Sequence, residues 1–315
     1  MPLPCRSCQD PCQYLQTSAA QLSGQTNQPA RQFCGRSWRR LQVTALPATQ
    51  LHTVGDIQLA YVDSGGPGTP VLLVHAAYLS KQAWEAQWTA LSAHHRVIAV
   101  DLRGHGESSA GIWPFSIPLV AEDLAGLLDA LGIRRAHVCG HALGGMAALH
   151  LALQHPDRVR SLVLVDTTAS VQSTVMQAVT AQLAWPVIAL TGIRRQATLM
   201  TRALAPNDQT LQRTLLRQIL TFEDRPEAYR VIWDAMMSFE LLADLPRITC
   251  PTLILIGGRH PVTHGQARRL QAGLPDAELR VIPRAGHLVT MEQPAVVNDF
   301  LLRFWNERSG PPPLV

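Results

Sequence analysis

Lysine is almost absent from this sequence, in which Lys81 is the only lysine among 27 basic residues. We attribute this bias to genomic composition rather than to function. Long apolar runs are absent too, since no stretch approaches the roughly 18 residues of a transmembrane helix. The N-terminus also lacks an apolar core of about 7–15 residues, which a secretory signal requires. These absences predict a cytoplasmic protein without a membrane partner.

Excess charge is absent from most of the chain. The net charge is +4, but residues 1–50 hold five arginines and a single acid, Asp10, and so carry the whole surplus. Residues 51–315 hold 22 basic and 22 acidic residues. A balanced chain gives no electrostatic reason to bind nucleic acid or an anionic membrane. We therefore expect a small-molecule substrate or ligand, and the oligomeric state stays open.

Cysteine is too scarce for a disulfide scaffold, with six residues in 315, and this usage favours a reducing compartment. Cys5, Cys8 and Cys12 lie close together, with Cys34 later. A second ligand pair at regular spacing is missing, so we expect no metal and no cofactor.

The two ends of the chain have the composition of unfolded segments. Residues 1–45 are rich in Gln, Ser, Pro and Arg without a sustained period, which predicts a disordered N-terminal extension. The same Arg-rich, acid-poor composition also fits an organellar transit peptide or a gene start placed too far upstream. Residues 307–315 are predicted to form a Pro-rich tail.

Short apolar strands alternate with amphipathic helices from Leu51 onward. The run Val71–Val74 is continuously apolar, which is typical of a strand covered on both faces. Such alternation predicts right-handed crossovers and a mostly parallel sheet. Strands are predicted at 51–54, 57–62, 71–74, 97–100, around 136–140, 159–165, 252–256 and 279–282, with helices at 81–91, 117–131, up to 154, 264–274 and 294–305.

The alternation stops between Thr167 and Phe239, where apolar residues recur at helical spacing. We predict a helical lid at 167–239, inserted after the sixth strand between the core segments 46–166 and 240–306. The predicted apolar stripes are Val171, Val175, Met176, Val179 and Leu183; Leu211, Leu215, Leu216 and Ile219; and Tyr229 through Met237.

One stretch organises the rest of the chain. Gly140-His141-Ala142-Leu143-Gly144 has the frame of the G-x-S-x-G nucleophile elbow, a strained strand-to-helix turn that presents a serine oxygen. Ala142 occupies the serine position, and its methyl group cannot form an acyl intermediate.

Across about residues 51–306 the chain resembles the α/β-hydrolase superfamily, because five motifs occur in the family's order. The resemblance implies an α/β-hydrolase fold, with a mostly parallel eight-stranded sheet flanked by helices. The motifs are Leu72–His75, Asp101–Ser108, the elbow frame, Pro251–Gly257 and Ala285-Gly286-His287.

The resemblance also assigns the catalytic positions, which in this family run serine, acid, histidine along the chain. His287 matches the histidine, and Ala142 replaces the serine. The acid position falls on His260, which carries no fixed negative charge to orient an imidazolium. Asp166, directly after the sixth strand, is a candidate replacement acid, and the alternative is a loop or helix-cap role.

The oxyanion donors implied by the resemblance are the backbone N–H groups of Ala77 and Leu143. Backbone donors survive side-chain changes. The family's His-Gly pair is His75-Ala76 here, so a residue with less backbone freedom replaces glycine.

Other polar residues in these motifs are expected to support the site. His141 and His105 lie beside glycines and are expected to line or support the pocket. Asp101 and Arg103 are expected to form a structural pair within their loop rather than to act in catalysis.

Three interpretations of the site remain open. The first is a hydrolase, or related lyase, of a small ester, amide, carbamate or lactone that uses His287 as general base without a serine. The Gly-His-Ala-Leu-Gly motif resembles the corresponding motif of hydrolases that are assigned to act on aminoacrylate or carbamate in pyrimidine degradation. This resemblance supports the first interpretation. The second is a catalytically inactive hydrolase fold that binds a ligand or regulates. The third is a serine-to-alanine variant of a serine hydrolase.

Overall fold

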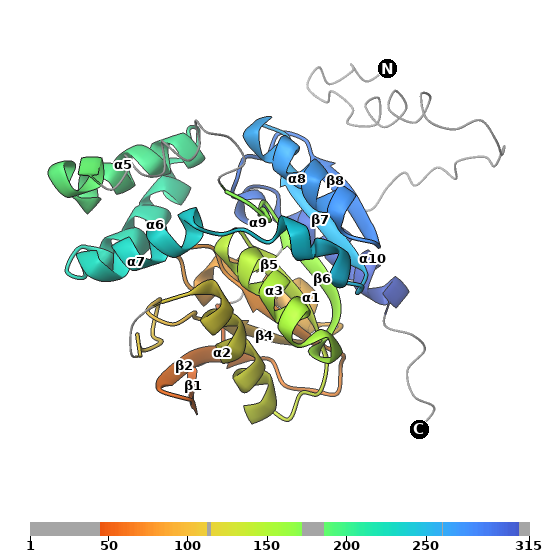
Figure 1. The fold of residues 1–315 in the computed structure, drawn as a ribbon. Coiled ribbons are helices and arrows are strands. Elements are labelled where there is room, and N and C mark those ends of the chain that lie inside the picture. Colours follow the sequence, from red (N-terminus) through yellow and green to blue (C-terminus); the bar gives the residue numbers. More distant parts are fainter. Residues whose placement is uncertain (1–44, 112–114, 172–185, 260, 309–315) are drawn as a thin grey trace, which may run out of the picture. The chain divides into compact units, whose positions relative to one another are not determined.

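The computed structural model describes residues 45–111, 115–171, 186–259 and 261–308. Within them, eight strands form one sheet in the order β1-β2-β4-β3-β5-β6-β7-β8 (Figure 1). β1 and β2 pair antiparallel, β2 pairs antiparallel with β4, and all later pairs are parallel. The strands are β1 Gln50–Val54, β2 Ile57–Asp63, β3 Pro70–Val74, β4 Arg96–Val100, β5 Ala136–His141, β6 Val159–Val165, β7 Thr252–Gly257 and β8 Ala277–Ile282.

Successive residues of the central strands face opposite sides of the sheet, and each side has its own apolar core. In β3, Leu72 and Val74 belong to one core, whereas Val71 and Leu73 belong to the other. This is the two-residue period of a strand buried on both faces. The predicted parallel sheet is therefore confirmed.

Helices cover both faces of the sheet. The α2–α3 pair lies side by side across one face (Figure 1), where α8 also packs on β7 and β8. The other face is covered by α1 and α10, whose aromatic residues pack on the sheet. The bounds are α1 Glu85–Ser92, α2 Ile117–Ala130, α3 Leu143–Gln154, α8 Pro261–Gly273, α9 Val289–Glu292 and α10 Pro294–Arg308.

Between β6 and β7 the chain forms an insertion of helices, here called the inserted helices: α5 Ile193–Leu204, α6 Gln209–Ile219, the 3₁₀ turn η4 Leu220–Phe222, and α7 Pro226–Met237. Ser170 and Glu240 form an antiparallel bridge, so the insertion leaves and re-enters the sheet domain at one point. The predicted stripe from Val171 to Leu183 lies almost wholly outside the described residues. Whether the insertion works as a lid stays a prediction.

Two predicted helices begin differently in the structure. The segment predicted as one helix at 81–91 is a 3₁₀ turn, η2 Lys81–Trp84, followed by α1. A carboxylate accepts the Lys81 backbone N–H at 2.6 Å, and that bond fixes the start of the turn. The helix predicted from His264 begins three residues earlier, at Pro261, and proline is favoured in a first helical turn because it needs no N–H partner there.

Candidate active site

The elbow is a sharp turn between β5 and α3. Ala142 has φ 48° and ψ −111°, a backbone conformation that residues with a side chain rarely adopt. Two glycines make this turn sterically feasible. A Cβ on Gly140 would lie 2.2 Å from the carbonyl oxygen of Gly144, and one on Gly144 would lie 2.2 Å from that of Val74. The glycine frame read in the sequence therefore reflects backbone packing, which holds whichever side chain occupies position 142.

Ala142 and His287 line the same cavity, which has a volume of about 190 Å³. Most of the lining comes from apolar side chains of the inserted helices and of the loops after β3 and β8. The described lining residues are Ala76, Ala77, Tyr78, Leu79, Ala142, Met200, Leu204, Leu215, Ile219, Trp233, Met236, His287 and Leu288. No arginine or lysine is among them.

A larger groove of about 620 Å³ lies between α2, α3 and α7, lined among others by Phe115, His150 and Asp234. Neither Ala142 nor His287 borders it. Because it is wide and open and holds no part of the elbow, we place the candidate active site at the smaller cavity.

The two predicted oxyanion donors belong to different elements. Leu143 is the first residue of α3, so its N–H has no partner within the helix and lies at the positive end of the helix dipole. Ala77 belongs to a turn in which the Leu79 N–H donates to the Ala76 carbonyl at 3.2 Å. Both residues therefore offer backbone N–H groups, as predicted, and their role toward a substrate stays a prediction.

His75 is occupied by bonds within the protein. Its Nδ1 donates to the Ala76 carbonyl oxygen at 2.7 Å, and its Nε2 accepts the Leu102 N–H at 3.0 Å. Burial lowers the pKa of His75 to about 4, so the ring is neutral. The C=O and N–H of one trans peptide point in opposite directions, so by holding the Ala76 oxygen the ring also orients the Ala77 N–H.

His141 supports the loop that carries His287. Its Nε2 donates to the His287 carbonyl oxygen at 2.8 Å, and the two ring centroids lie 5.4 Å apart. Burial lowers the pKa of His141 to about 4. His287 itself is half-buried at the cavity wall.

Asp166 follows β6 and is buried, with 3% of its surface exposed. Its carboxylate accepts the Gly257 N–H at 3.2 Å. Burial, with a smaller contribution from the nearby charge of Glu292, raises the pKa of Asp166 to about 8. A carboxyl with that pKa is mostly protonated at neutral pH and lacks the charge that orients an imidazolium. His260, the predicted acid position, lies outside the described residues.

Asp101 and Arg103 do not pair with each other, so the prediction of a loop pair is wrong. Asp101 binds Lys81 Nζ at 2.7 Å, whereas Arg103 forms a two-bond ion pair with Asp123 on α2. These two side chains of one loop diverge because each binds a partner on a different neighbouring element. Both side chains form ion pairs within the protein, and the expectation that neither acts in catalysis stays a prediction.

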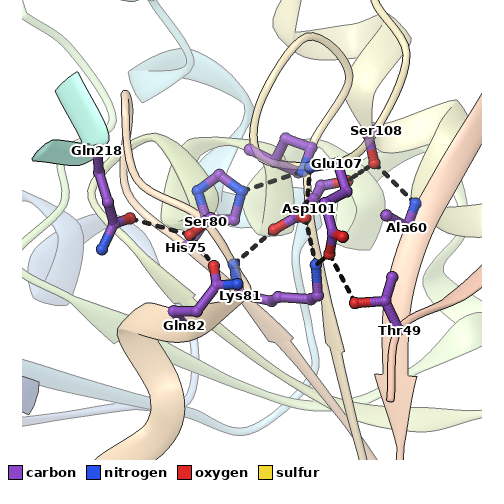
Figure 2. A network of polar contacts seen from close by, with 11 residues as sticks. Thr49, Ala60, His75, Ser80, Lys81, Gln82, Asp101, Glu107, Ser108 and Gln218 are labelled. Atoms are coloured by element: carbon purple, nitrogen blue, oxygen red, sulfur yellow. Dashed lines mark hydrogen bonds and ion pairs between the residues drawn. The ribbon is translucent and has the colours of Figure 1, made fainter. Parts of the chain in front are cut away.

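A polar network that is buried at Lys81 and Asp101 and exposed at Glu107 connects the loop after β3 to the loop after β4 (Figure 2). Lys81, of which 1% is exposed, binds Asp101 and also Glu107 at 2.5 Å. Asp101 further accepts the Glu107 N–H at 2.9 Å. One feature of the sequence singles out this residue, its isolation as the only lysine, and the sequence pattern placed it only at the start of a predicted helix.

No group of three or more His, Cys, Asp or Glu side chains that could hold a metal ion occurs in the described part of the chain. None of the described helices is long and apolar enough to cross a membrane. The elbow, the parallel sheet and the cavity define the class: a protein of hydrolase fold with its candidate site at the carboxyl ends of the strands.

The comparisons with known proteins agree with this class. Residues 71–300 match the model of the Alpha/beta hydrolase family, and the chain belongs to that family. A relative from Caulobacter sp. (strain K31), named "Putative carbamate hydrolase RutD", is 33% identical over 251 residues, which cover 76% of this chain and 92% of the relative.

Solved structures show the same fold. A hydrolase from Pseudomonas aeruginosa PA01 superposes with a TM-score of 0.73 at 28% identity, covering 81% of this chain and 97% of its own. A thermophilic esterase from Thermogutta terrifontis has a TM-score of 0.73 at 29% identity, covering 83% and 99%. The predicted α/β-hydrolase fold is confirmed.

Proposed function

We propose that this protein hydrolyses a small ester, amide, carbamate or lactone by direct attack of water, with His287 as general base. The observation that carries the proposal is that Ala142, in the backbone conformation of the elbow, and His287 line one cavity. A methyl group at the nucleophile position leaves room where a serine oxygen would stand, and water can occupy that room.

The proposed reaction is balanced without a covalent enzyme intermediate. His287 takes one proton from water as the water oxygen bonds to the carbonyl carbon. The resulting oxyanion accepts hydrogen bonds from the Ala77 and Leu143 N–H groups. The C–N or C–O bond then breaks, and the proton held by His287 passes to the leaving nitrogen or oxygen. A positioned base of this kind contributes about 10²–10⁴-fold to the rate.

The cavity favours a small substrate without a net charge. Its volume of about 190 Å³ corresponds to roughly six water molecules at about 30 Å³ each. An anionic substrate would lose hydration there without a cationic partner among the described lining residues, and such a loss is costly. The name of the Caulobacter relative supports a carbamate within this class.

A catalytically inactive binding protein is the second candidate. It is favoured by the absence of a nucleophile at Ala142 together with the protonated state of Asp166 at neutral pH. This candidate predicts saturable ligand binding without product formation, so an assay for product distinguishes the two proposed functions.

The test is a product assay with neutral carbamates, esters and lactones of about ten non-hydrogen atoms, comparing the wild type with His287→Ala. We expect turnover in the wild type and a loss of at least tenfold in the variant, which corresponds to about 1.4 kcal/mol. His150→Ala, which alters a half-buried histidine of the larger groove, is the matched control and should keep full activity. Saturable binding without product would favour the second candidate, and a loss below tenfold would remove His287 as the base.

A further inference from the structure

Tyr78 is the residue after the proposed oxyanion donor Ala77, and its backbone is unusual. Its φ is 61°, in the left-handed region that favours glycine. Ala77 and Tyr78 are the two central residues of the turn closed by the Leu79 N–H on the Ala76 carbonyl. A positive φ at the second central residue is typical of a type II turn, which normally has glycine there. Something must therefore hold a tyrosine in this place.

Residues of the inserted helices contact the Tyr78 side chain and stabilise this conformation. The ring of Tyr78 stacks on the ring of Tyr229 in α7, with centroids 4.1 Å apart and planes 8° from parallel. Its hydroxyl donates to the backbone carbonyl oxygen of Tyr229 at 3.1 Å. The edge of Phe222 in η4 completes the contact at 5.4 Å. Only 3% of the Tyr78 surface is exposed, so the side chain is enclosed by the insertion.

Residues 76–81 form one loop, and its carboxyl end also contacts both the inserted helices and the sheet domain. Ser80 donates from Oγ to the side-chain oxygen of Gln218 in α6 at 2.9 Å, and the next residue, Lys81, binds Asp101 (Figure 2). Residues 76–81 are thus held on one side by α6 and α7 and on the other by the buried ion pair.

We propose that Tyr78 is a positioning residue that makes the oxyanion donor depend on docking of the inserted helices. Stacking on Tyr229 holds the turn in its left-handed conformation, and the turn, together with His75, orients the Ala77 N–H. When α7 moves away, Tyr78 loses its enclosure, the turn relaxes, and the donor turns from the cavity. The inference rests on the proposed function, since it concerns the proposed oxyanion donor.

Amide hydrogen exchange tests the link without any need for a substrate. The Leu79 N–H closes the turn, so its exchange rate reports whether the turn is formed. We expect Tyr229→Leu to accelerate Leu79 exchange at least tenfold. Tyr229→Phe keeps the stack and the backbone acceptor, and should change the rate less than threefold. Phe239→Leu removes a buried aromatic residue that packs on His150, and serves as the matched control with a change below threefold.

A double substitution separates positioning from general loosening. Glycine adopts the left-handed conformation freely, so Tyr78→Gly should keep the turn within about threefold of the wild-type exchange rate. Adding Tyr229→Leu to Tyr78→Gly should then cause no further acceleration. If Tyr229→Leu does not fold, Tyr78→Phe, which loses only the bond to the Tyr229 carbonyl, should still accelerate Leu79 exchange at least threefold.

With a substrate in hand, Tyr229→Leu should lower kcat at least tenfold and change KM less than threefold. The proposal is overturned if Leu79 exchange is unchanged in Tyr229→Leu, or if Phe239→Leu accelerates it equally. A protein that turns over no substrate would contradict the proposed function, and the exchange measurements would still decide the role of Tyr78.

Discussion

His141 and His287 are joined by a hydrogen bond of 2.8 Å from the ring of the first to the backbone carbonyl of the second. His141, the residue directly before the nucleophile position Ala142, thus holds the loop that carries the proposed base. Removing this bond in His141→Ala frees that loop, and a misplacement near 1 Å costs about 10²-fold in rate. We expect kcat to fall by about 10–10²-fold, measured in the product assay. His137→Ala, on the same strand but bonded to Ser161, should lose stability and keep its activity.

Restoring a serine should not restore a serine hydrolase. The Ala142→Ser variant places a hydroxyl at the elbow, but Asp166 is mostly neutral at pH 7 and cannot stabilise an imidazolium. We expect no gain in esterase turnover and no labelling by a serine-directed phosphonate. Strong labelling with restored turnover would instead identify the chain as a serine-to-alanine variant.

Acid should unfold this protein early, because four histidines are buried in the neutral form. Burial lowers the pKa to about 4 in His75 and His141, and to about 3 in His105 and His137. The unfolded chain takes up protons near its ordinary pKa of about 6.5 while the folded chain does not, so stability falls as pH drops below that value. At pH 5 each histidine costs about 2 kcal/mol.

The combined cost of charging these four histidines approaches the whole unfolding free energy of a typical domain, about 5–15 kcal/mol. We therefore expect the urea midpoint to fall steeply between pH 7 and pH 5. His137→Asn removes one of the four groups and should recover about 2 kcal/mol of that loss. Equal pH dependence in the variant and the wild type would contradict this account.

Asp166 should change the pH dependence of stability in the direction opposite to that of the buried histidines. Its folded pKa of about 8 lies above its ordinary value, so the folded state favours the protonated carboxyl. The stability it contributes is complete below about pH 4 and is lost as pH rises toward 8. Asp166→Asn keeps a neutral side chain and a residue that tolerates the φ of 40°. As pH rises from 5 to 8, the unfolding free energy of Asp166→Asn should therefore increase relative to that of the wild type, whatever the pH dependence that the two proteins share.

Breaking the buried ion pair should be costly. Lys81→Met leaves Asp101 buried, at 0% exposure, without its cation, and loss of one partner of a buried pair costs about 3–5 kcal/mol. Arg303→Met breaks the exposed pair with Asp299 and should change stability by less than about 1 kcal/mol. Urea unfolding of both variants checks the difference.

The sheet and the elbow could be predicted from the sequence because both depend on local patterns. Apolar runs such as Val71–Val74 mark buried strands, and Gly140 and Gly144 mark a turn that no larger residue fits. The nucleophile and histidine positions followed from the order of the motifs. The structure places Ala142 and His287 at one cavity, and their catalytic roles stay predictions.

The supporting contacts could not be predicted because they join residues far apart in the chain. Tyr78 and Tyr229 are separated by 151 positions, and neither belongs to a recognisable motif. Lys81 follows β3 and pairs with Asp101, which follows β4. No rule of sequence spacing predicts this pair. Whether His105 and His141 line the pocket or support it could also be decided only from the structure, since hydrogen-bond partners distinguish a ligand-facing histidine from one that holds a loop.

The burial of Lys81 has a consequence for chemical labelling. Because no other lysine exists in the sequence and this amine is enclosed by two carboxylates, acylating reagents find no accessible lysine on the folded protein. Modification of Lys81 therefore requires the network beside the candidate active site to open. The rate at which a mass spectrometer detects that single adduct measures how often this opening occurs in the native protein.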